Sequence, residues 1–93
     1  MTTVHVSIGN SDDKLSQRDW AEFVRFLGLT MFDHCDQIYG EWYSLPSARW
    51  QNACIGGEVH DDRIEGLRSA LSALRETYKQ DSLAWLACST EFI

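Results

Sequence analysis

The feature that most constrains the fold is the hydrophobic repeat, which changes from two residues to about 3.6 and back, twice along the chain. A repeat of two puts alternate side chains on one face of a strand, whereas a repeat of about 3.6 forms one face of a helix. The sequence therefore predicts the element order β-α-β-β-α-β.

The first half of the chain predicts a strand, a helix and a second strand. Residues 2–8 alternate as in a half-buried strand, and turn-forming residues end it at 9–13. Ser16 followed by Asp19 resembles a capping box at the start of a helix. The apolar residues that follow share one helix face: Trp20, Phe23, Val24, Leu27 and Met31. Residues 37–45 are rich in β-formers and predict the second strand.

The second half repeats the same order of strand, helix and strand. Residues 50–59 predict a third strand, in which the glycines at 56–57 indicate a bulge or a close backbone approach. Asp62 with Glu65 is a second capping signal. One apolar helix face follows: Ile64, Leu67, Leu71, Leu74 and Tyr78. Residues 82–92 predict a last strand whose two faces are both apolar, so we expect both to be covered.

Elements in this order most often form a ferredoxin-like sandwich. We therefore predict a single α+β domain over residues 1–93. It has a four-stranded antiparallel sheet in the order 4-1-3-2, with both helices on one face.

Charge and cysteine content narrow the classes of function. The 14 acidic against 8 basic residues, a net charge of −6, argue against binding to a nucleic-acid polymer or to an anionic membrane. No apolar run is long enough to span a membrane, and the first residues do not resemble a signal peptide. The 3 cysteines form no CxxC pair. We expect a cytoplasmic protein with buried thiols.

The predicted topology brings separate polar segments to one end of the sheet. These are the loop after the first strand, the start of the first helix, the hairpin at 45–50 and the loop at 79–81. The candidate ligand-binding residues there are Asn10, Lys14, Arg18, Tyr43, Arg49, Trp50, Gln51 and Asn52. A helix N-terminus beside cations attracts phosphate or carboxylate, and an aromatic beside an amide suits a nucleobase. The prediction is a small anionic ligand, for instance a nucleotide.

Two observations weigh against that ligand. Asp12 and Asp13 repel phosphate unless a cation or a ribose hydroxyl satisfies them. No phosphate-loop motif is present. The alternative is that these segments are a solvated turn and a solvated hairpin.

The sheet face away from the helices is a second candidate surface. We expect His5, Ser7, Asn52 and Cys54 on this face, together with one of two aromatic sets that depends on the register. The sets are Tyr39 with Tyr43, or Trp42 alone. Large exposed apolar patches are uncommon on monomers, so we expect a symmetric homodimer through this face.

Candidate catalytic and metal-binding groups are weak by comparison. His34, Cys35 and His60 fit no zinc spacing. Cys54 with His5 is a conceivable nucleophile and base, but no oxyanion-hole motif accompanies them. We expect no metal and no cofactor, and binding rather than catalysis.

Three stretches resemble small hypothetical proteins of actinobacteria and their phages. They are SIGNSDDKLSQRDW (residues 7–20), GEWYSLPSARWQNAC (residues 40–54) and YKQDSLAW (residues 78–85). The resemblance implies a bacterial or phage setting and assigns no catalytic residue. By analogy, some small phage proteins inhibit host immunity by sequestering nucleotide signals.

The leading functional prediction is thus a non-enzymatic small-ligand-binding protein, in its sharpest form a phage-type sequestering protein for a nucleotide-derived signal. One alternative is a protein–protein inhibitor or adaptor that uses the acidic surface and the aromatic sheet face. A third hypothesis is a small enzyme of the dimeric α+β barrel kind, with His5 in its cavity.

Overall fold

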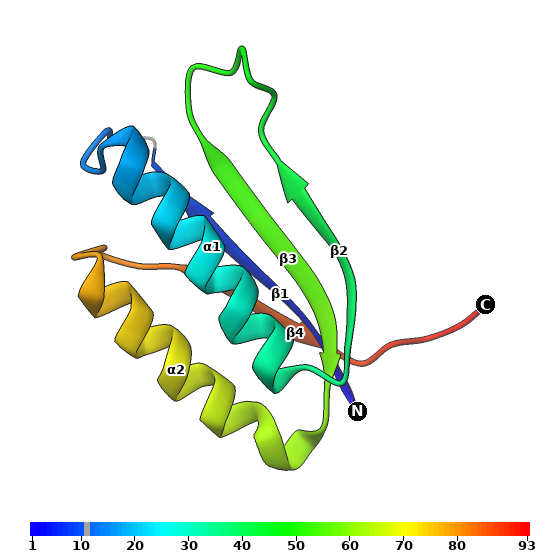
Figure 1. Ribbon diagram of the computed structural model, residues 1–93. Helices are drawn as coiled ribbons and strands as arrows, with labels where there is room; N and C mark the ends of the chain where they lie inside the picture. Colours follow the sequence, from blue (N-terminus) through cyan, green and yellow to red (C-terminus); the bar gives the residue numbers. More distant parts are fainter. Residues whose placement is uncertain (11) are drawn as a thin grey trace.

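The computed structural model describes residues 1–10 and 12–93, so Ser11 of the predicted turn lies outside the described residues. The elements, in chain order, are β1 (Thr2–Gly9), α1 (Gln17–His34), β2 (Gln37–Tyr43), β3 (Asn52–Val59), the 3₁₀ turn η1 (Asp61–Arg63), α2 (Ile64–Thr77) and β4 (Ala84–Cys88). The antiparallel sheet has the order β2-β3-β1-β4, and both helices cover one face of it (Figure 1). The predicted α+β ferredoxin-like fold is confirmed.

The core lies between the helices and one face of the sheet. Val4 and Val6 of β1 point toward the helices and are fully buried against Phe23 and Leu27 of α1 and Leu67 of α2. Each such side chain contributes about 1.5–3 kcal/mol through burial. The alternation of β1 and the helical repeats of α1 and α2 therefore determine which face of the sheet is covered.

The two helices begin differently. Ser16 caps α1, because its hydroxyl accepts a hydrogen bond from the backbone N–H of Asp19 at 3.1 Å. The cap predicted at Asp62 is wrong, since α2 has Arg63 at its N-cap position and no side-chain cap. The reason is the 3₁₀ turn η1, which places Asp62 inside a helical turn instead of before one.

A bulge in β2 settles the aromatic register. The pairing with β3 shifts between Ile38 and Gly40, so Tyr39 is an extra residue. Its hydroxyl donates to Glu58 at 2.7 Å on the face away from the helices. An extra residue reverses the side-chain alternation. Trp42 therefore lies on that face too, opposite Cys54. The expectation of either the tyrosines or the tryptophan is thus corrected: Tyr39 and Trp42 share this face. The bulge expected at Gly56 and Gly57 of β3 lies instead in β2, the strand that pairs with them.

The close backbone approach expected at those glycines is present, and it leads to a test. A Cβ on Gly57 would lie 2.8 Å from the carbonyl oxygen of Gln37 and 3.2 Å from the sulfur of Cys35. We expect Gly57→Ala to lower the free energy of unfolding by about 1–3 kcal/mol, as overpacking does. The matched control is Gly66→Ala in α2, where the nearest atom, of His34, is 3.9 Å away. There a gain of up to about 1 kcal/mol is expected. Urea denaturation measures both, and equal stability of the two variants would contradict this packing.

The last strand is shorter than predicted and is covered on one face alone. β4 ends at Cys88, and Leu86 is 61% exposed on the face away from the helices. The expectation of cover on both faces is wrong because the helices pack on the opposite face. Beyond β4 the hydroxyl of Thr90 contacts that of Thr3, and the chain then runs away from the fold (Figure 1). None of the helices in the described residues has the length and apolarity needed to cross a membrane.

Candidate functional site

A cleft of about 350 Å³ lies where the loop after β1, the first turn of α1 and the β2–β3 hairpin meet. We call it the hairpin cleft. The predicted residues that line it are Asn10, Tyr43, Arg49, Gln51 and Asn52. Lys14, Arg18 and Trp50 do not line it. Segments far apart in the sequence therefore meet at this cleft, as the topology predicted. Of the three predicted cations, Arg49 lines the cleft and Lys14 and Arg18 do not.

Asn10 holds the loop together and has no free polar atom for a ligand. The side chain is 4% exposed. Its amide nitrogen donates to the carbonyl oxygen of Leu15 and to the side chain of Gln51, both at 3.1 Å. Its oxygen accepts from the backbone N–H of Leu15 at 3.1 Å. Asn10 is thus a structural clamp between β1, α1 and the hairpin.

Removing this clamp has a measurable cost. Asn10→Ala leaves the buried backbone groups of Leu15 without their partner, and we expect the free energy of unfolding to fall by about 1–3 kcal/mol. The exposed Asn52 is the control, because Asn52→Ala should stay within about 0.5 kcal/mol of the unsubstituted protein. Chemical denaturation compares the two. A smaller loss for Asn10→Ala than for Asn52→Ala would refute the clamp.

Gln17, which the sequence analysis missed, pairs with Gln51 across the cleft. The Gln51 amide donates to the Gln17 oxygen at 2.7 Å, and the Gln17 amide donates back at 3.1 Å. This double hydrogen bond ties the first turn of α1 to the hairpin. The only signal in the sequence was the position of Gln17 directly after the helix cap.

The charges at the cleft come from Arg49 and Asp13. Within residues 1–10 and 12–93, Arg49 forms no ion pair, and its guanidinium lies 5.1 Å from the centre of the Trp50 ring. Lys14 is engaged elsewhere, at 3.0 Å from Asp81. The hydrogen bond and the charge of Asp81 raise the pKa of Lys14. Arg49 is therefore the cation that a ligand in this cleft would meet.

The remaining polar groups of the cleft are partly committed. The hydroxyl of Tyr43 donates to Glu41 at 2.8 Å, which raises the pKa of Tyr43. The hydroxyl oxygen of Ser44 accepts from the backbone N–H of Asn52 at 3.1 Å. The Asn52 amide makes one long contact, 3.4 Å, to the carbonyl oxygen of Trp50. A ligand would therefore meet the Arg49 guanidinium, the exposed Tyr43 ring and the Asn52 amide.

A row of side chains crosses the sheet on the face away from the helices. Leu86 of β4 is opposite His5 of β1, and His5 is opposite Gly56 of β3. Gly56 is in turn opposite Gly40 of β2. The Trp42 indole covers both glycines, and its ring centre lies 5.9 Å from that of His5. A Cβ on Gly56 would lie 2.7 Å from the His5 ring, so a larger residue there would force that ring to move.

We call Leu86, His5 and Trp42 the open-face row. Trp42 is 52% exposed, and no helix covers it. Two of its three side chains are large and apolar, in a protein with a net charge of −6. The exposure of Trp42 and Leu86 favours an interface, because covering these two side chains would bury apolar surface that now faces water.

The cysteines and histidines do not assemble a reactive group. Cys54 is opposite Ser7 in the β1–β3 pairing and is half-buried, so it is not the cross-strand partner of His5. Burial raises the pKa of the Cys35 thiol. The expectation of buried thiols is wrong for Cys88, which is exposed because it faces outward on an edge strand. Among the described residues, no three His, Cys, Asp or Glu side chains are close enough to hold a metal ion.

Comparison with known proteins gives structural likeness alone. No protein-family model and no curated protein sequence matches this chain. A dimeric ferredoxin-like protein of unknown function from Thermobifida fusca YX has a TM-score of 0.62 at 12% identity, over 97% of this chain and 92% of its own. A formyltetrahydrofolate deformylase from Pseudomonas putida KT2440 has a TM-score of 0.56 at 12% identity. That match covers 96% of this chain and 28% of the deformylase. At this identity the likenesses show the fold.

Proposed function

We propose that this chain is a non-enzymatic binding domain that holds a small anionic ligand of the nucleotide class in the hairpin cleft and acts as a homodimer. The observation that carries the proposal is Arg49, which lines the cleft without an ion pair among the described residues. A guanidinium with free donors suits phosphate, because it binds two phosphate oxygens at once.

The nucleotide class follows from what surrounds Arg49. Tyr43 offers an exposed ring for stacking, and the Asn52 amide can hydrogen-bond the edge of a base. Asp13 also lines the cleft and repels phosphate, so it would face a ribose hydroxyl. In the bacterial or phage setting that the resemblance implies, such a protein would sequester a nucleotide-derived signal.

The homodimer is supported by the open-face row and by a likeness in fold. The Thermobifida fusca protein that shares this fold is dimeric. In a symmetric dimer the Trp42 and Leu86 side chains of one copy would be buried against the other. The hairpin cleft includes residues from the helix side of the sheet, so both surfaces could be used together.

A thermal-shift panel tests the ligand proposal. The panel contains nucleoside mono- and diphosphates, cyclic dinucleotides and ADP-ribose. A ligand at about 100 times its Kd stabilises the native state by about 2.7 kcal/mol. In a domain of this size each 1 kcal/mol raises Tm by about 4–8 °C, so the shift is easily measured. No shift with any member of the panel would contradict the proposal.

The alternative function is a protein–protein inhibitor or adaptor. The observation that favours it is the same open-face row, since a host protein could cover Trp42 as well as a second copy could. Under this alternative the purified chain is monomeric, and it recovers one protein at equal stoichiometry in a pull-down. Under the leading proposal the purified chain is a dimer, so the two outcomes differ.

A further inference from the structure

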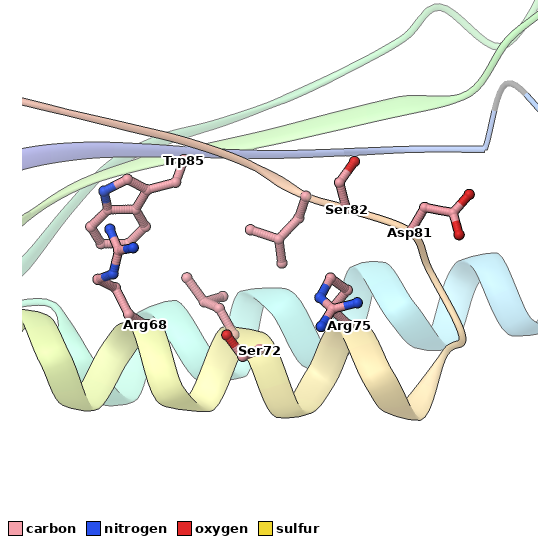
Figure 2. A pocket seen from close by; sticks show the side chains of 8 residues that line it. Arg68, Ser72, Arg75, Asp81, Ser82 and Trp85 are labelled. Atoms are coloured by element: carbon pink, nitrogen blue, oxygen red, sulfur yellow. The ribbon is translucent and has the colours of Figure 1, made fainter.

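A second cleft lies on the helix side of the sheet, between α2 and the segment that leads into and forms β4 (Figure 2). Its volume is about 260 Å³, and we call it the α2–β4 groove. It shares no lining residue with the hairpin cleft. It also lies on the opposite face from the open-face row, so a dimer formed through that row would leave the groove accessible.

The helix wall of the groove is polar and basic. Arg68, Ser72 and Arg75 follow the spacing i, i+4 and i+7, which places them on one stripe of α2. Arg75 is held in place, because it donates to the carbonyl oxygen of Gln80 at 3.0 Å and lies 3.7 Å from Glu76. Arg68 forms no ion pair within the part of the chain that the structure describes.

The strand wall of the groove is mainly apolar. Trp85 is opposite Val6 in the β1–β4 pairing, so its indole points toward the helices, and Leu83 points the same way. Both are half-buried, and Leu71 of α2, which is buried, also lines the groove. The Arg68 guanidinium lies 5.3 Å from the centre of the Trp85 ring. The groove thus has one charged wall and one apolar wall.

The acid in the groove is balanced by a lysine. Asp81 lies at the end of the groove away from Trp85 (Figure 2). Its carboxylate accepts a hydrogen bond from the ammonium of Lys14 at 3.0 Å. Because Asp81 is paired with Lys14 and Glu76 with Arg75, the positive charge of the groove comes mainly from Arg68, in a chain whose net charge is −6.

We propose that the α2–β4 groove binds a small anion with an apolar body, a carboxylate or a phosphate monoester. Arg68, Ser72 and Arg75 hold its charged group, and the body packs against Leu83 and Trp85. Guanidinium groups bind both kinds of oxyanion in a bidentate manner, and apolar contact adds affinity through burial. The groove is somewhat smaller than the roughly 300–1,000 Å³ of drug-sized sites, so it fits a small molecule.

The test is a titration of isotope-labelled protein followed by amide and indole NMR signals. The probes are phenyl phosphate, indole-3-acetate, inorganic phosphate and the neutral phenol. We expect phenyl phosphate or indole-3-acetate, or both, to shift the Trp85 indole N–H and the Ser72 and Ser82 amides saturably. Which of the two binds identifies the anion. Phenol and inorganic phosphate should each bind at least tenfold more weakly, because phenol lacks the anionic group and inorganic phosphate lacks the apolar body.

Variants separate this site from the hairpin cleft. Arg68→Ala removes an exposed side chain that forms no ion pair among the described residues. We expect it to weaken probe binding at least tenfold, while the dispersion of the amide signals shows that the variant is still folded. Arg49→Ala, in the other cleft, should leave it unchanged. Three outcomes would overturn the proposal: no saturable shift at millimolar probe, equal binding of phenol, or full affinity in Arg68→Ala. None of them bears on ligand binding at Arg49.

Discussion

Replacing Trp42 with glutamate is expected to convert the proposed homodimer into a monomer. In a dimer built through the open-face row the new carboxylate would be buried against an apolar surface without a partner, which costs several kcal/mol. The loss corresponds to at least a hundredfold rise in the dimer dissociation constant. Light scattering after size exclusion should therefore give a mass near 10.7 kDa for the variant and about twice that for the unsubstituted chain.

A matched control shows which face of the molecule forms the dimer interface. Phe32 of α1 is 73% exposed and lies on the helix side of the molecule. Phe32→Glu introduces the same charge in place of a large aromatic and should remain dimeric. Trp42 is half exposed in the single chain, so circular dichroism of Trp42→Glu should show an intact fold. A dimer that survives Trp42→Glu, or dissociates equally in Phe32→Glu, would refute an interface at the open-face row.

The second large effect is expected at Arg49. Arg49→Ala removes an arginine that lines the hairpin cleft and forms no ion pair within residues 1–10 and 12–93, and a hydrogen bond to a charged group contributes about 1.5–3 kcal/mol. Ligand affinity should fall by about 10–100-fold. At a nucleotide concentration of about ten times the original Kd, the thermal shift should then fall by about 70% for a tenfold loss of affinity and by about 95% for a hundredfold loss.

Arg18→Ala is the control for that experiment. Arg18 is an exposed arginine of the first turn of α1 that does not line the cleft, so its removal takes away the same charge from the same end of the molecule. The thermal shift should persist in Arg18→Ala. Equal losses in both variants would mean that the nucleotide responds to net charge and not to the hairpin cleft.

Much of the fold could be predicted from the sequence because its patterns are local. The alternation in β1 and the apolar faces of α1 and α2 are read directly from spacing, and together they determine the order of elements. Hydrogen-bond detail was harder. The bulge at Tyr39 depends on how β2 pairs with β3, and the sequence of either strand alone does not predict that pairing.

The candidate site was predictable in location and less so in chemistry. Topology brought Asn10 and Arg49 to one cleft, as expected. Topology could not show that the Asn10 amide donates to Leu15 and Gln51, or that the Lys14 ammonium donates to Asp81. The contacts of Asn10 with Gln51 and of Lys14 with Asp81 join segments far apart in the sequence, and spacing along the chain does not predict such contacts. The α2–β4 groove was missed for the same reason. The spacing of Arg68 and Arg75 predicts that they share one stripe of α2, but it does not predict that Trp85 of β4 lies opposite them.

Native mass spectrometry with the nucleotide that gives the largest thermal shift tests the central claim most directly, since it counts subunits and bound ligand in one spectrum. The account predicts a dimer of the 10.7 kDa chain carrying one nucleotide per chain, with the nucleotide lost in Arg49→Ala. A spectrum that holds only ligand-free monomer would contradict it.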